Sequence, residues 1–306
     1  SARIMASGVR RELTGWTREL QEVAASPRLR DLLSSVVDRD WARRNALDEY
    51  LDAARQLANH RRSASGRSPD ASWFVVDRNG FQRWRGPTNL STLDKQWAHR
   101  DYFHGHGREY AGANLPPDLA PIDSPHISLA FQSKATGRAI VALSVPITDE
   151  DGNVVAILAG TRELGSILSA PYAEHKPSID APDASTVVRT IAILDLRDGR
   201  LLDHPWLQQH VQSAPVVSLD QATRTRLADA QSNTAPQSTI RLDNYTDPVA
   251  KHSTDFHGRW LAAFSGIGDS GWFAVVQERR DRALQPIEAM RRNVLSTWQY
   301  ALSVSG

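Results

Sequence analysis

The sequence predicts an α+β protein in which a long N-terminal helix precedes two modules built on antiparallel sheets, and a C-terminal helix follows them. Apolar residues recur at helical spacing up to about Asn59, short β-rich runs separated by turns fill two later stretches, and helical spacing returns near Arg279. These patterns divide the chain into a helical stalk at 1–70, a first module at 71–169, a second module at 170–278 and a C-terminal helix at 279–306.

The N-terminal region carries an apolar stripe whose members are three or four residues apart, which is the spacing of one face of a helix. Ser26-Pro27 is typical of a second helix start, because proline is tolerated in the first turn. The segment HRRSASGRSPD, residues 60–70, has the composition of a linker. The stripe consists of Val9, Leu13, Trp16, Leu20 and Val23.

The first module begins with a predicted hairpin. Trp73–Val76 and Phe81–Trp84 are strand-like and flank a turn with Asn79-Gly80, a pair that favours tight hairpins. A turn-rich stretch with HRDYFHGHG and a proline-rich loop follow. The pattern then predicts strands at Ile127–Gln132, Ala139–Val145 and Val154–Ala159, the last two joined by Asp149–Asn153.

The second module repeats this order of strands more weakly, after a proline-containing boundary at 170–183. A polar insert, helical or loop, runs to about Pro236. The C-terminal helix has an apolar face interrupted by Pro286. The predicted strands are Thr190–Leu194, Arg200–Leu202, Ser238–Leu242, Trp260–Ser265 and Trp272–Gln277.

Composition excludes several classes of function. The 306 residues are 41% hydrophobic and include 36 basic and 35 acidic residues, a balance that argues against a dedicated nucleic-acid binder. Cysteine is absent, which excludes disulfides, cysteine-ligated metal and cysteine nucleophiles. No apolar run reaches the ~18 residues of a membrane span, and the chain begins with Ser1, so we expect an excised fragment whose membrane anchor lies outside it.

Four segments carry a resemblance to a known family. WFVVDRNG (73–80), HRDYFHG (99–105), ISLAFQSKATGRAIVALSVPI (127–147) and DEDGNVVAILAG (149–160) resemble the membrane-distal half of a double Cache sensor domain. The resemblance implies two PAS-like modules on a long N-terminal helix, with the C-terminal helix directed toward the membrane. It is strongest over about residues 72–168, and the second half matches by pattern alone.

The resemblance implies an extracytoplasmic sensory part of a bacterial plasma-membrane receptor or kinase, not an enzyme. A small molecule would bind the distal module, and the signal would cross the membrane to an output domain outside this sequence. The alternative is a ligand-free interaction module that forms a homodimer through the N-terminal helix, because the apolar stripe also suits helix pairing. Neither hypothesis requires a cofactor or a nucleic acid.

The resemblance also assigns ligand-binding positions. In the amino-acid-binding branch of the family, an Arg and an aromatic residue two positions later hold the ligand carboxylate, which corresponds here to Arg100 and Tyr102. The positions that hold the ligand amine correspond to Phe131, Ser133 and Thr161, none of which carries a negative charge. We therefore expect a carboxylate or another anion rather than an amino acid.

Each of these candidates has a structural alternative. Arg100 could instead form an ion pair with Asp101 or another local acid. Four aromatic residues are candidates for a pocket lining, although core packing is the favoured explanation for any single one of them. Tyr102 is the strongest, because its hydroxyl is polar. The aromatic candidates are Trp84, Trp97, Tyr102 and Phe103.

Other motifs carry weaker signals. His99, His104 and His106 lie close together, but no carboxylates stand at metal-ligand spacing, so we predict no metal site and leave the role of these histidines open. Gly268–Gly271 contains the GDSG sequence of serine proteases, yet the flanking apolar runs favour a hairpin turn. The acidic segment Asp149–Asn153 lacks EF-hand spacing and is also predicted to be a turn.

Overall fold

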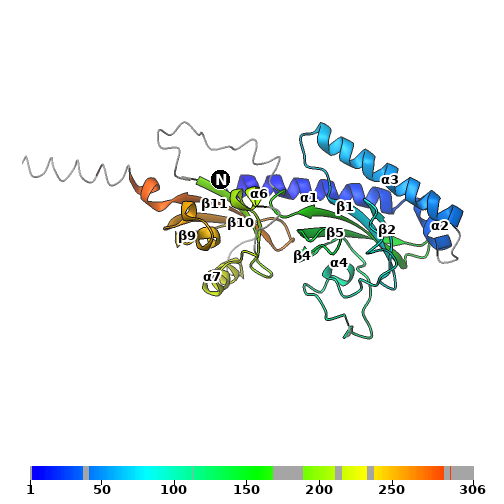
Figure 1. Ribbon diagram of the computed structural model, residues 1–306. Coiled ribbons are helices and arrows are strands. Elements are labelled where there is room, and N and C mark those ends of the chain that lie inside the picture. The colour runs from blue at the N-terminus through cyan, green and yellow to red at the C-terminus, as the bar shows by residue number, and fades with distance from the viewer. Residues whose placement is uncertain are drawn as a thin grey trace, which may run out of the picture.

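Helix α1 (Ala2–Ala24) lies along two antiparallel sheets placed one after the other, so the molecule is elongated (Figure 1). The predicted α+β class is confirmed. The structure, a computed structural model, describes residues 2–36, 41–112, 114–167, 189–210, 216–232, 238–285 and 290.

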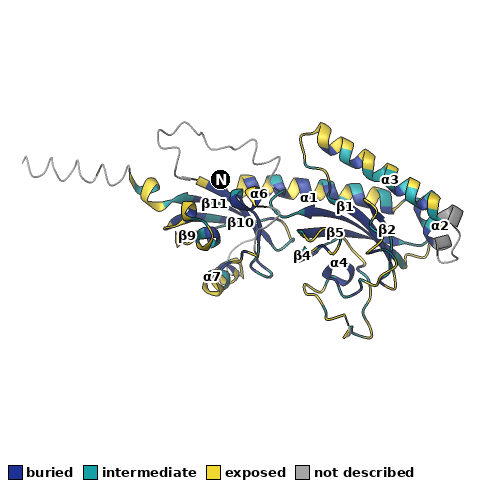
Figure 2. Ribbon diagram, viewed as in Figure 1, coloured by how far each residue is buried: buried dark blue, intermediate teal, exposed yellow. Residues whose placement is uncertain are grey.

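Helix α1 forms because its apolar residues recur on one face, and that face is buried against both sheets (Figure 2). Four members of the predicted stripe are buried, and the fifth, Val23, is partly buried. Helix α2 (Pro27–Val36) begins at the predicted proline, and helix α3 (Trp41–Ala64) packs against α2.

Helix α3 extends into the segment predicted to be a linker, so that prediction was wrong for residues 60–64. The reason is an ion-pair network that the local composition does not show. Arg62, in the last turn, is buried and donates from Nε to Glu19 Oε2 at 2.9 Å, and its Nη1 lies 3.5 Å from Asp70 Oδ1. These partners hold the helix end against α1.

The first sheet has the strand order β2-β1-β6-β5-β3, with β4 also paired to β5. One face packs on α1 through Val75, Val141 and Leu158, and the other packs under the short helix α4 (Asp101–His104). The strands are β1 (Ser72–Asp77), β2 (Gln82–Gly86), β3 (His126–Ile127), β4 (Phe131–Gln132), β5 (Ala139–Thr148) and β6 (Val154–Glu163).

The strand predicted over Ile127–Gln132 is broken into β3 and β4, because the residues between them bond elsewhere. The Leu129 amide donates to Asp101 Oδ2 at 2.7 Å. Arg197 donates to the carbonyls of Ile127 at 2.7 Å and Ser128 at 3.1 Å, and Arg200 donates to that of Ala130. Both arginines come from the second sheet unit, so this segment joins the two halves of the molecule.

The second sheet repeats the arrangement, with the order β8-β7-β11-β10-β9. Its strands are β7 (Arg189–Asp195), β8 (Leu201–Asp203), β9 (Thr239–Tyr245), β10 (Trp260–Gly266) and β11 (Trp272–Arg279). The predicted insert forms α6 (Pro205–Gln209) and α7 (Gln221–Ser232), and β9 leads into the 3₁₀ turns η1 (Pro248–Lys251) and η2 (Thr254–Phe256).

Two predictions concern segments that the structure covers only in part. The boundary predicted at 170–183 lies outside the described residues. Of the C-terminal helix predicted at 279–306, Arg279 is instead the last residue of a strand, and residues 280–285 and 290 are helical. Among the described residues, no helix has the length and apolar character needed to cross a bilayer.

The segments Gly268–Gly271 and Asp149–Asn153 both form turns, as predicted. Ser270 donates from Oγ to the Ile267 carbonyl at 2.6 Å and accepts from the Trp272 amide at 3.1 Å, so its hydroxyl stabilises the β10–β11 hairpin. Asp149 likewise accepts from the amides of Asp151 and Asn153 in the β5–β6 hairpin.

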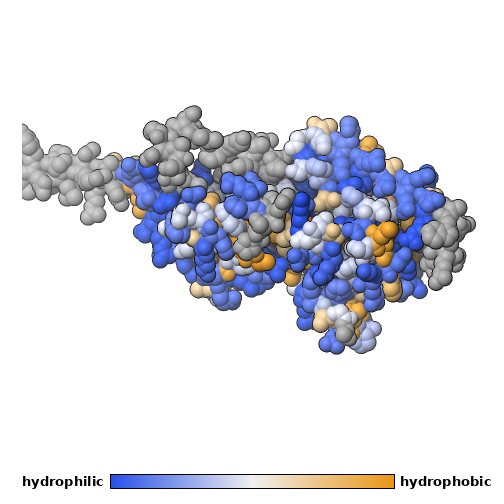
Figure 3. All heavy atoms as spheres, viewed as in Figure 1, coloured by the Kyte–Doolittle hydropathy of each residue, from blue (hydrophilic) through white to orange (hydrophobic). Residues whose placement is uncertain are grey.

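The face of the molecule seen in Figure 3 is mostly hydrophilic, with small separate hydrophobic patches.

Candidate ligand-binding site

The site is organised by α4, a single helical turn that carries Tyr102 and Phe103 and is preceded by Arg100. Its anchor is Asp101, which is 1% exposed and accepts hydrogen bonds from the amides of Gly107 and Leu129, both at 2.7 Å, and from His126 Nε2 at 3.1 Å. Burial raises the pKa of Asp101, but these hydrogen bonds outweigh it and hold the pKa below its usual value.

Gly105 ends the turn with φ at +70°, and a Cβ there would lie 3.1 Å from Ile122. The turn is therefore fixed at both ends, and the side chains that it presents are positioned by the fold rather than by a free loop.

Tyr102 lies between two aromatic rings over the sheet face that points away from α1. Its ring centroid is 4.9 Å from that of Phe74 and 5.4 Å from that of Phe131. Phe103 is buried in the same cluster and Trp97 is partly buried against it. The Tyr102 hydroxyl makes no hydrogen bond within the described residues, and burial raises its pKa despite the nearby positive charge of Arg100.

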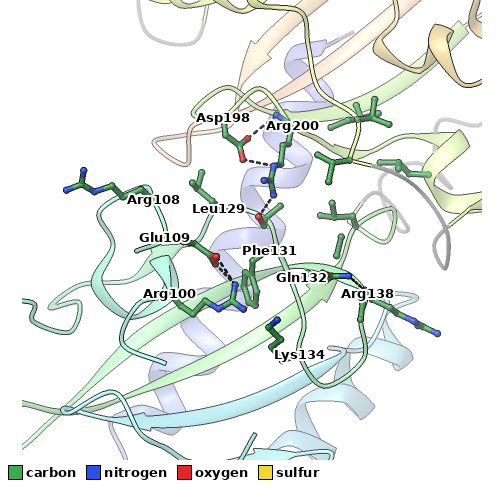
Figure 4. Close-up of a pocket in the computed structure, with 18 of the residues that line it drawn as sticks. Arg100, Arg108, Glu109, Leu129, Phe131, Gln132, Lys134, Arg138, Asp198 and Arg200 are labelled. Atoms are coloured by element: carbon green, nitrogen blue, oxygen red, sulfur yellow. Dashed lines mark hydrogen bonds and ion pairs between the residues drawn. The ribbon is translucent and has the colours of Figure 1, made fainter. Parts of the chain in front are cut away.

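Arg100 is 7% exposed and its charge is already paired. Its Nη1 donates to both carboxylate oxygens of Glu109, at 2.6 and 2.8 Å, and the guanidinium lies 5.1 Å from the centre of the Phe131 ring (Figure 4). The alternative of an ion pair with a local acid therefore describes the observed state, with Glu109 rather than Asp101 as the acid.

Arg100 and Phe131 also face a cavity of about 890 Å³ between the two sheet units (Figure 4). Positive charge predominates in it. Its walls include apolar side chains from both halves, such as Leu129 and Val217. The basic side chains of its lining are Arg100, Arg108, Lys134, Arg138 and Arg200, and the acidic ones are Glu109 and Asp198.

The structure brings most of the predicted site residues to one face of the first sheet. Thr161 is on this face but is fully buried, and its hydroxyl accepts from the Ser72 amide and donates to the Ser72 carbonyl, both at 3.1 Å. Ser133 is buried in the turn between β4 and β5, where its amide donates to the Arg138 carbonyl.

Trp84 is not brought to this face. It lies opposite Val75 in the β1–β2 pairing and packs in the core on the helix-covered face of the sheet, so the sheet separates it from Tyr102. We therefore leave Trp84 out of the candidate site. Strand alternation could have shown this, because Trp84 and its neighbour Arg85 must point to opposite faces.

Arg85 and Glu109 are the residues that sequence reasoning missed. Arg85 lies directly opposite Phe74 on the neighbouring strand and is 8% exposed. An arginine inside a strand that is buried on both faces is unusual, and this pattern could have identified Arg85 as a candidate. No sequence pattern indicated Glu109, because its pairing with Arg100 depends on how the loop after α4 folds back.

His104 and His106 form a ring cluster with Tyr110. The rings of His104 and His106 are 4.7 Å apart, and His106 Nδ1 is 2.8 Å from the Tyr110 hydroxyl. Burial lowers the pKa of His104, and also that of His99, where Arg100 adds to the effect. Within the described part of the chain, no group of three or more metal-ligating side chains comes together.

Comparison with known proteins identifies the fold. No family profile matches the chain, and neither does any curated protein sequence. Among solved structures, the sensor domain of the V. cholerae histidine kinase DctB matches with a TM-score of 0.53 and 12% identity, over 88% of this chain and 90% of that one. The chain has the double Cache fold.

Two chemoreceptor domains share this double Cache fold. The ligand-binding domain of Pseudomonas aeruginosa PctB, in complex with L-Arg, matches with a TM-score of 0.51 and 14% identity over 92% of this chain and 93% of that one. The ligand-binding domain of Pseudomonas fluorescens CtaA, in complex with L-leucine, matches with a TM-score of 0.50 and 13% identity over the same shares. The matches span both sheet units, and at these identities they establish the fold.

Proposed function

We propose that the chain is the extracytoplasmic sensory domain of a bacterial membrane receptor or kinase, and that it binds a small anionic molecule in its first sheet unit. This unit would be the membrane-distal module, 71–169, and the second would be the proximal module, 170–278. The observation that carries the proposal is a buried arginine, Arg100, held over Phe131 beside the unbonded hydroxyl of Tyr102. The fold shared with ligand-binding sensor domains supports it.

The chemistry of the site favours an anion without an amine. An ammonium group removed from water needs an acid partner, because its desolvation is otherwise uncompensated. The three positions that would supply one are Phe131, Ser133 and Thr161. The hydroxyl of Thr161 is already bonded to Ser72. A carboxylate, by contrast, finds a guanidinium and a phenol.

Glu109 acts in this proposal as an internal competitor. Its carboxylate occupies the position on Arg100 that a ligand carboxylate would take, at 2.6 and 2.8 Å. The Glu109 side chain is 39% exposed, so it can move out into water when a ligand replaces it. Ligand binding at Arg100 is thus an exchange of one charge-assisted pair for another.

The segment between β3 and β4 would carry the signal to the proximal module. Phe131, which touches Tyr102 and Arg100, directly follows the carbonyls held by Arg197 and Arg200. A shift of Phe131 on ligand binding would therefore change the packing of β7–β8, and the C-terminal helix would pass the change to a membrane segment and an output domain. Only a difference in affinity between two packings is needed.

The test is a thermal-shift screen of the chain against carboxylates, amino acids, amines, purines and sugars, repeated with Arg100→Ala. A ligand at about 100 times its dissociation constant adds about 2.7 kcal/mol of apparent stability, which raises the melting temperature by several degrees. Arg138→Ala is the matched control, because Arg138 lines the same cavity and is also paired with an acid, Glu163.

We expect a carboxylate hit whose thermal shift is smaller in Arg100→Ala and unchanged in Arg138→Ala. A hit with unchanged affinity in Arg100→Ala would refute the role of Arg100. A flat panel with a folded protein would instead favour the alternative, a ligand-free dimerisation module.

The geometry supports this alternative less well. The α1 stripe from Val9 to Leu20 is buried against the chain's own sheets, so a dimer through that face would have to displace these contacts. Sedimentation at several protein concentrations would detect such a dimer.

A further inference from the structure

Arg85 is a buried charge that has no partner among the residues that the structure describes. Its side chain points from β2 to the same sheet face as Phe74, its directly opposed neighbour, and Phe74 contacts Tyr102. The residue is 8% exposed, and its guanidinium makes no hydrogen bond or ion pair within the described part of the chain. The nitrogens of the guanidinium retain a small solvent-accessible surface.

Among the described residues, no acid compensates the charge of Arg85. The groups that act electrostatically on Arg85 are the Tyr102 phenol and Arg55, a second cation. Burial lowers the pKa of the Arg85 guanidinium, the phenol raises it, and Arg55 lowers it further. A guanidinium in such surroundings is costly for the folded state unless something brings a negative charge to it.

The other buried arginines show that this is unusual for the protein. Four arginines of the described residues are more than nine-tenths buried, and three of them have acid partners. Arg62 pairs with Glu19, Arg162 with Glu12 at 2.7 Å, and Arg100 with Glu109. Arg85 is the fourth, and among the described residues it is the one whose buried positive charge has no acid partner.

We propose that Arg85 is the primary anion-binding residue of the distal site, holding a carboxylate ligand without an amine between its guanidinium and the Tyr102 hydroxyl. This inference rests on the proposed sensory function and deepens it. Arg100 must first release Glu109 to engage a ligand, whereas no acid of the described segments competes for Arg85. Arg85 therefore contributes more to the affinity than Arg100 does.

The experiment compares Arg85→Met with Arg100→Met, using acetate, propionate, pyruvate, succinate and benzoate as probes and calorimetry as the readout. The matched control is Arg83→Met, two residues away on the same strand, where Arg83 pairs with Asp77 and Asp94 at the surface. We expect Arg85→Met to weaken carboxylate binding by at least about tenfold, Arg100→Met to weaken it less, and Arg83→Met to leave it unchanged.

Stability without ligand provides a second readout. Because Arg85→Met removes an uncompensated buried charge, it should raise the melting temperature of the ligand-free protein, whereas Arg100→Met should lower it by leaving Glu109 unpaired. A lower melting temperature in Arg85→Met, or failure to fold, would show a structural role and overturn the inference.

A third readout uses the wild-type protein, so it does not depend on any variant. Crystals soaked in bromide should show an anomalous peak against the Arg85 guanidinium, and a peak at Arg100 with none at Arg85 would overturn the inference. Affinity retained in Arg85→Met but lost in Arg100→Met would also overturn it and leave the sensory function standing. A wild type that binds none of the five probes would overturn both.

Discussion

Replacing Glu109 with Gln should tighten carboxylate binding and at the same time destabilise the ligand-free protein. Glu109 holds both carboxylate oxygens on Nη1 of Arg100, which is 7% exposed. The amide of Gln has no charge, so it competes less with a ligand for the guanidinium. The same change leaves a buried positive charge less well compensated before the ligand arrives.

The magnitude follows from the exposure of the two partners. A hydrogen bond to a charged group contributes about 1.5–3 kcal/mol. The acid here is 39% exposed, so water screens the pair, and about 1 kcal/mol is a reasonable share. Glu109→Gln should therefore bind a carboxylate about fivefold more tightly and lose about 1 kcal/mol of unfolding free energy without ligand.

Titration calorimetry with the best carboxylate of the screen measures the first effect, and urea unfolding measures the second. Glu163→Gln is the control, because Glu163 pairs with Arg138 at 2.7 Å but does not line the cavity. It should leave the affinity unchanged. Unchanged or weaker binding in Glu109→Gln would refute the idea that Glu109 occupies a ligand position.

Three further predictions test other parts of the argument. Burial lowers the pKa of His99 and His104 below about 6.5, so at lower pH the unfolded chain binds protons that the folded chain does not bind. The urea concentration at the unfolding midpoint should therefore decrease as the pH is lowered from about 7 to about 5, and a constant midpoint would contradict this. Arg197→Met removes the cation that lies 2.6 Å from the fully buried Asp195, together with the contacts to the β3–β4 segment. It should lower the unfolding free energy measured by chemical denaturation by about 2 kcal/mol. Arg197→Lys should recover part of this loss. Tyr102→Phe should leave the melting temperature of the ligand-free protein unchanged or higher, because the Tyr102 hydroxyl has no partner among the described residues. In the same thermal-shift assay, the variant should bind a carboxylate more weakly. Equal binding would remove the phenol from the site.

The sequence by itself determined most of the long helices and strands and their order, because these depend on local physics. Residues three and four apart share a helix face wherever they occur, which explains why the stripe from Val9 to Leu20 is the buried face of α1. Asn79-Gly80 and Gly268–Gly271 carry turn chemistry in the residues themselves, and both lie in hairpins. The absence of an acid at Phe131, Ser133 and Thr161 is also a property of the sequence alone.

Only the tertiary structure decided which charges meet. Arg100 binds Glu109 because the loop after α4 folds back on it, and Arg197 interrupts a strand 69 residues away. Partners of this kind are set by packing between distant segments, which no local pattern encodes. The isolation of Arg85 is the clearest case. A sequence can show that an arginine lies in a buried strand, but only the complete set of neighbours shows that none of them, among the described residues, is an acid.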